Sequence, residues 1–151
     1  MRATTLSVLA AALTASATPA AATGGFGCET ADPSVTFSAE ASMSRGMGGV
    51  FIDFTASLAI ALDGVPDDMR HLTLDGALTH SWIDGKALKL QFYTERQAEP
   101  FASLDFVVET EAVEEGTYRG SYSLAVFAVP SDHDTDRDMW MAEGAVTCFV
   151  E

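Results

Sequence analysis

Residues 52–62, IDFTASLAIAL, decide the fold class of this chain. Hydrophobic side chains occupy every second position from Ile52 to Leu62, and Asp53 begins the series of residues that alternates with them. A period of two is that of a β-strand, in which successive side chains point to opposite faces, whereas an amphipathic helix needs apolar residues three or four positions apart. The stretch therefore predicts a half-buried antiparallel strand with its even-numbered side chains in the core.

The same alternation recurs elsewhere, so strands are expected almost throughout the chain. Further alternating stretches lie at residues 35–41, 88–93, 104–109, 118–126 and 139–150. Many short strands separated by turns at regular spacing are typical of all-β sandwiches and barrels. We expect an all-β domain, an antiparallel β-sandwich or small barrel of about seven or eight strands.

Asp-Gly dipeptides mark the turns between these stretches. Asp84-Gly85 stands between two alternating stretches and predicts a tight hairpin, because Gly readily adopts the positive φ that such turns need. Asp75-Gly76 is either another such turn or a β-bulge; the bulge is the alternative because the alternation that passes through Leu74 continues beyond it with little room for a reversal.

Cys28 and Cys148 are the two cysteines of the chain, and they lie near opposite ends of the expected mature domain. In an oxidising compartment two such cysteines are expected to form a disulfide. Closing a loop of about 120 residues would stabilise the fold by roughly 4–5 kcal/mol in the chain-entropy model. A lipid anchor at Cys28 is the alternative, and the preceding residues 25–27, Gly-Phe-Gly, match a lipobox poorly.

Residues 1–22 have the pattern of an export signal. Arg2 provides a basic start, residues 6–15 form a short apolar core, and the alanines of residues 20–22 fit the small-residue rule for cleavage. The apolar core is much shorter than the roughly 20 residues that a membrane-spanning helix needs. We therefore expect a signal peptide at residues 1–22, a single domain at residues 23–151, and a periplasmic or secreted protein.

The net charge of the chain limits the classes of partner that it is expected to bind. The formal net charge is −14, and loss of residues 1–22 would remove Arg2 but no acidic residue, which gives −15. So negative a protein repels phosphate backbones and anionic lipid, which disfavours nucleic acid and membrane insertion and favours cations or a basic protein surface as partners. Solubility is the other explanation of an acidic surface.

One acidic segment has the spacing of a calcium loop. Asp132, Asp134, Asp136 and Glu143 stand at relative positions 1, 3, 5 and 12, which is the ligand spacing of an EF-hand loop. The segment departs from that pattern because Arg137 replaces the Gly of position 6 and strands, not helices, are expected on both sides. Metal binding at these four residues, with Ca²⁺ as the candidate ion, is one hypothesis, and a solvated acidic connection is the other.

No pattern indicates an enzyme of a known type. The histidines are isolated, and neither a Gly-x-Ser-x-Gly elbow nor a His-Glu-x-x-His zinc motif is present. His80 is two positions from Leu78 and Trp82, so it is expected to share their face and to be partly buried and hydrogen-bonded. No catalytic or cofactor-binding residue is therefore assigned.

The pattern favours a binding role. A rigid β-sheet domain that presents loops and carries no catalytic motif is typical of a binding or accessory module, here of unknown ligand, either a small molecule or a protein. Two alternatives stay open: a calcium-stabilised domain that uses residues 132–143, and a small secreted hydrolase.

Overall fold

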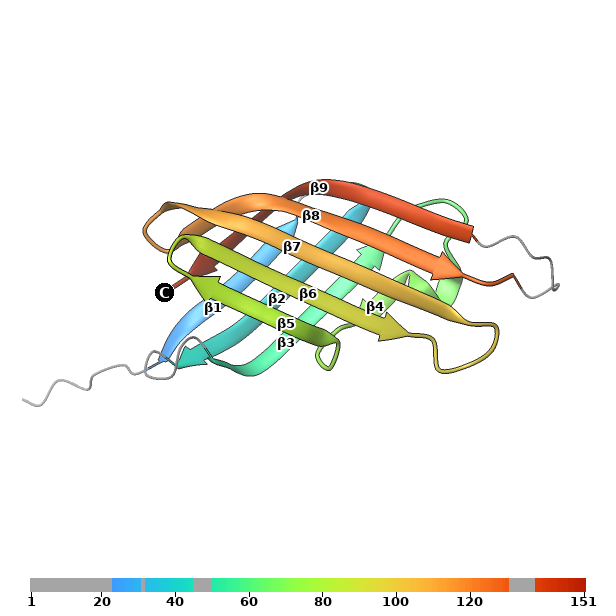
Figure 1. The fold of residues 1–151 in the computed structure, drawn as a ribbon, viewed down its shortest axis with the longest axis horizontal. Coiled ribbons are helices and arrows are strands. Elements are labelled where there is room, and N and C mark those ends of the chain that lie inside the picture. The colour runs from blue at the N-terminus through green and yellow to red at the C-terminus, as the bar shows by residue number, and fades with distance from the viewer. Residues whose placement is uncertain (1–22, 31, 45–49, 131–137) are drawn as a thin grey trace, which may run out of the picture.

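The computed structural model describes residues 23–30, 32–44, 50–130 and 138–151. Within them, nine strands form one antiparallel sheet in the order β4-β3-β2-β1-β9-β8-β7-β6-β5 (Figure 1). One short 3₁₀ helix, η1 (Asp67–Met69), precedes β4. The strands are β1 (Thr23–Thr30), β2 (Val35–Ser44), β3 (Val50–Ile60), β4 (His71–Thr73), β5 (Leu78–Asp84), β6 (Ala87–Glu95), β7 (Ala102–Glu114), β8 (Thr117–Ala128) and β9 (Asp138–Val150).

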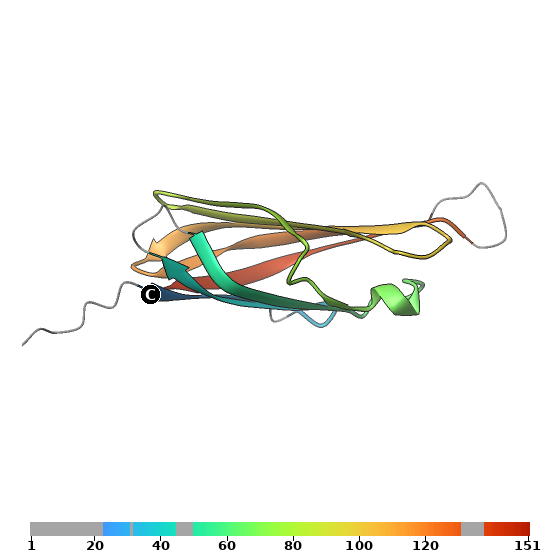
Figure 2. The same cartoon turned by 90° about the horizontal axis from the view of Figure 1, so that it is seen from below.

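The sheet curls on itself into a half-barrel with two layers (Figure 2). Strands β1 to β4 form one layer and β5 to β9 the other, and the pairing of β1 with β9 joins them along one side. The expected all-β antiparallel architecture is confirmed. The described part of the chain has nine strands where about seven or eight were expected, partly because a turn divides one expected strand into β4 and β5.

That turn is the Asp75-Gly76 segment, for which a tight turn and a bulge were the two alternatives. The backbone N–H of Leu74 donates to Ala56 of β3 (2.8 Å), while the carbonyl of Ala77 accepts from the N–H of Tyr93 in β6 (2.9 Å). The segment thus carries the chain from one layer to the other and is hydrogen-bonded to both. The bulge interpretation was wrong because local alternation cannot reveal a change of layer.

The core lies between the layers and contains a group of packed aromatic rings. Phe37 of β2 lies against Phe106 of β7, with 4.7 Å between ring centroids, and Phe92 and Tyr122 extend the group. All four side chains are buried. They come from the alternating stretches, so the period of two correctly identified most inward-facing positions.

A β-bulge in β3 changes the face of its first residues. The pairing with β2 shifts between Glu40↔Thr55 and Ser42↔Ile52, and Asp53 has a φ of 52°. An extra residue in a strand reverses the alternation beyond it. Ile52 is consequently 41% exposed, and its expected place in the core was wrong.

Cys28 and Cys148 form the expected disulfide. They stand opposite each other in β1 and β9, and both are buried. The bond therefore reinforces the pairing that joins the two layers, and it indicates a non-reducing compartment. Residues 1–22, the expected signal peptide, lie outside the described residues. No helix in the described part of the chain is long and apolar enough to cross a membrane.

Candidate binding face

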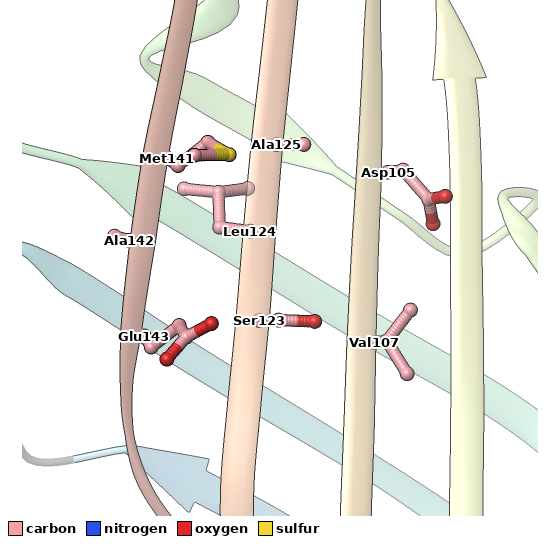
Figure 3. Close-up of a pocket in the computed structure, with 8 residues that line it drawn as sticks. All are labelled: Asp105, Val107, Ser123, Leu124, Ala125, Met141, Ala142 and Glu143. Carbon is pink, nitrogen blue, oxygen red and sulfur yellow. The ribbon is translucent and has the colours of Figure 1, made fainter.

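The outer surface of the β7–β8–β9 region contains a shallow hollow of about 490 Å³ (Figure 3). Odd-numbered residues of these strands point outward, because the even-numbered ones fill the core. The hollow is lined by Asp105, Val107, Ser123, Leu124, Ala125, Met141, Ala142 and Glu143.

Strand register arranges the outward side chains in two adjacent rows. Asp105 of β7 pairs with Ala125 of β8, which pairs with Met141 of β9. In the next row Val107 pairs with Ser123, and Ser123 pairs with Glu143. The central strand contributes small side chains to both rows while its neighbours contribute larger ones, and this difference in size produces the hollow (Figure 3).

The face around the hollow exposes more apolar surface than its acidic composition suggests. Met141 is 68% exposed and Met139, two residues earlier on the same face of β9, is 62% exposed. On the same face, near the opposite edge of the layer, Trp82 of β5 is 59% exposed and lines a second hollow that shares Val107 with the first. Lys89 and Gln91 of β6 separate Trp82 from Val107, so the exposed apolar side chains form two groups on this face, one at β5 and one around the hollow of β7–β9. Exposed apolar groups of this kind often mark interaction sites.

The charges on this face are partly compensated. Lys89 donates to Glu109 across β6 and β7 (2.6 Å), and the amide of Gln91 donates to Asp105 (3.2 Å). Among the described residues, Asp105 and Glu143 form no ion pair. These two carboxylates border the apolar floor of the hollow from strands that are separated by β8. The hollow therefore offers apolar contact between two hydrogen-bond acceptors of negative charge.

His80 lies on this face and is exposed, so the expectation that it is partly buried was wrong. The pairing of β5 with β6 shifts between Leu78 and His80, and this bulge separates the two residues onto opposite faces. His80 and Trp82 line the second hollow together, as the alternation within β5 predicted for that pair.

Of the four expected metal ligands, the structure describes Glu143. It lies in the middle of β9, five residues after the strand begins at Asp138, and its side chain is exposed. Asp132, Asp134 and Asp136 lie outside the described residues. Metal binding by this segment stays a prediction. Within the described ranges no other group of three or more potential ligands is assembled.

Asp32 and Tyr122 lie close together beside Gly144, and no sequence pattern indicated this polar cluster. The backbone N–H of Ser34 donates to Asp32 (2.7 Å), and this bond, followed by the nearby Tyr122 hydroxyl, lowers the pKa of Asp32. Burial and then the Asp32 carboxylate raise the pKa of Tyr122. The two groups influence each other, yet the buried hydroxyl has no partner in good hydrogen-bond geometry among the described residues. The hydrogen bond from Ser34 to Asp32 thus shapes the β1–β2 connection beside the buried phenol.

Comparisons with protein-family models, with curated proteins and with solved structures found no match.

Proposed function

We propose that this protein is an exported, non-enzymatic binding or accessory module whose binding surface is the outer face of β7, β8 and β9. The observation that carries the proposal is the hollow between Val107 and Met141, an apolar floor bordered by the carboxylates of Asp105 and Glu143. The partner is a protein segment that combines apolar side chains with Lys or Arg. The disulfide supports export, because such bonds persist outside reducing compartments.

Charge complementarity favours this partner. The chain has 22 acidic residues against 8 basic ones, so its field attracts a basic segment and repels an acidic one. The exposed methionine next to the small side chains of β8 adds an adaptable apolar contact, because Met is unbranched and flexible. Attraction and apolar contact together would select a basic amphipathic segment over a merely cationic one.

The test is a titration of the isotopically labelled protein with a heptapeptide of alternating Lys and Leu, followed by NMR at physiological salt. Amide shifts are expected to concentrate around Val107, Ser123, Ala125 and Met141. A heptapeptide of alternating Glu and Leu serves as the charge control. Equal binding of both peptides, or shifts confined to the β1–β4 layer, would refute the proposal.

Two matched double variants separate the local carboxylates from total charge. Asp105→Asn with Glu143→Gln should weaken binding of the basic peptide by about tenfold, since each partly exposed charge contributes up to about 1 kcal/mol. Glu29→Gln with Glu40→Gln removes the same charge from exposed positions of β1 and β2 and should leave binding nearly unchanged. Ala125→Phe should fill the hollow from its outer side and abolish binding without disturbing the core.

The calcium-stabilised domain and the small hydrolase stay alternative hypotheses. For the first, Glu143 lines the hollow of the proposed binding surface, so a metal role and a peptide-binding role for this carboxylate would compete.

A further inference from the structure

Strand β5 is an unprotected edge of the sheet. In the described chain its one strand neighbour is β6, so β5 is the outermost strand of the layer formed by β5 to β9 (Figures 1 and 2). Its sequence, LTHSWID, contains neither Pro nor Lys, the residues that most often prevent an edge from pairing with another chain. All but two of its side chains are exposed.

The hydrogen bonds of β6 show which backbone groups of β5 are free. Ala112 of β7 donates to the carbonyl of Lys86 (2.7 Å), so the even-numbered residues of this stretch direct their backbone groups toward β7. Tyr93 donates to the carbonyl of Ala77 (2.9 Å), so the odd-numbered residues of β6 face β5. The backbone groups of successive residues point to opposite sides of a strand, which extends this assignment along all of β6.

The register transfers the assignment to β5. Trp82 stands opposite Lys89, an odd-numbered residue, so the backbone groups of Trp82 belong to the β5–β6 ladder. Ser81 and Ile83 stand opposite even-numbered residues, so their N–H and C=O groups point away from the sheet. The edge therefore presents two backbone N–H donors and two backbone C=O acceptors, at the spacing that a partner strand needs for antiparallel pairing.

The other edge of the sheet is better protected. Strand β4 covers Ser57 to Ala59 of β3, and the Asp75 carboxylate accepts from the backbone N–H of Ala56. Before these residues, the bulge at Asp53 interrupts the regular spacing that a partner strand would need. Pairing with another chain is thus favoured at β5.

The charge around β5 is also unlike the rest of the molecule. Lys86 and Lys89, the two lysines of the chain, both lie in the β5–β6 hairpin, where Asp84 is the one carboxylate of residues 78–91. Glu109 of β7 compensates Lys89, so Lys86 and Asp84 leave the hairpin close to neutral. The whole chain has a net charge of −14. Two copies would repel each other least if they approached through these hairpins.

We propose that the occupant of the β5 edge is a second copy of this chain, bound antiparallel about a twofold axis at Trp82. In this register Ser81 of each copy pairs with Ile83 of the other, so each free donor meets a free acceptor. Trp82 faces the second Trp82 on the outer surface, and His80 of each copy faces Asp84 of the other. An aromatic pair and two contacts between a histidine and a carboxylate make the edge self-complementary.

The dimer is expected to be weak, because a strand of this length buries less surface than a permanent interface. Sedimentation velocity and small-angle scattering of the mature oxidised protein, over about 10 μM to 1 mM, should show a concentration-dependent dimer. A protein that stays monomeric over this whole range would refute a second copy as the occupant.

Ser81→Pro is the decisive variant. It removes an N–H that the monomer does not use and should weaken association by at least about tenfold, while circular dichroism and the melting temperature stay close to those of the native protein. Ser81→Ala keeps that N–H and should dimerise like the native protein. A folded Ser81→Pro protein that dimerises with undiminished affinity would contradict the proposal.

Charge exchange tests the register. His80→Glu places a carboxylate opposite Asp84 of the other copy and should weaken the dimer, and adding Asp84→Lys should restore it. Failure of the second substitution to restore association, in a variant that remains folded, would refute the register centred on Trp82. These outcomes do not depend on peptide binding at the β7–β9 face.

Discussion

Gly144 lies where the interior has no room for a side chain. A Cβ at this position would contact the Asp32 carboxylate and lie 2.8 Å from the hydroxyl oxygen of Tyr122. The glycine lies in β9 opposite Tyr122 of β8, so the absent side chain lets the buried phenol reach toward the β1–β2 connection. Sequence alternation marks Tyr122 as inward-facing but gives no indication of this contact.

We expect Gly144→Ala to reduce the free energy of unfolding by about 1–3 kcal/mol, because the added methyl group overpacks the cluster. Urea denaturation measures the loss. Gly76→Ala is the matched control, since a Cβ there meets nothing within 4 Å. If Gly144→Ala lost no more stability than Gly76→Ala, crowding against Asp32 and Tyr122 would not be the cause.

At the scale of elements, Arg96 connects η1 to the end of β6. Its guanidinium donates to both carboxylate oxygens of Asp68 (2.7 Å each) and to the carbonyl of Pro100 (2.7 Å). The hydrogen bond from Arg96 is the largest cause of the lowered pKa of Asp68, and its charge adds to the effect. This bidentate pair fixes η1 against the β6–β7 connection.

Because the folded state lowers the pKa of Asp68, the ion pair stabilises the fold at pH values above the ordinary carboxyl value of 3.8 and loses that contribution as the pH falls below it. Asp68→Asn should therefore lose less stability between about pH 5 and pH 3 than the native protein. Urea denaturation at several pH values measures this difference. Glu111→Gln removes an exposed carboxylate without an ion pair among the described residues and should keep the native pH dependence.

Two bulges explain where local patterns failed. The alternation in residues 52–62 correctly predicted a strand, yet the bulge at Asp53 turned Ile52 outward. The shift after Leu78 likewise put His80 on the exposed face. A bulge depends on what the neighbouring strand requires, so the sequence of one strand does not reveal it.

At the scale of the whole molecule, the disulfide closes the contact between the first and the last described strands. Cys28 and Cys148 are separated by 120 residues and lie where β1 meets β9. Breaking this bond would give the unfolded chain more conformational freedom while leaving the hydrogen bonds between β1 and β9 of the native state in place. The stabilisation should accordingly be large.

Cys28→Ala with Cys148→Ala should lower the free energy of unfolding by roughly 4–5 kcal/mol in the chain-entropy model. Urea denaturation of the oxidised protein and the double variant, with the reduced native protein as a control for cavity effects, measures the difference. A loss below about 1 kcal/mol in both would show that the unfolded chain gains little freedom when the bond is absent.

The hollow on the outer face of β7, β8 and β9 could not be predicted from the strands taken one at a time. Asp105, Ala125 and Met141 come from three different strands, and the hollow exists because register aligns them in one row. The spacing of acidic residues predicted Glu143 as a metal ligand, and the structure shows that it also lies beside Ser123 on this face. Pairing between strands, which is set by packing of the whole core, decides such neighbours.

The sequence by itself determined the all-β class, most inward-facing positions and the disulfide, because a period of two and a pair of cysteines are local or compositional signals. Tertiary structure decided the curl into two layers, the change of layer at Asp75-Gly76, the bulges, the hollow and the free edge at β5. Each of these depends on which strands become neighbours, and that choice is made by the joint burial of side chains from distant parts of the chain.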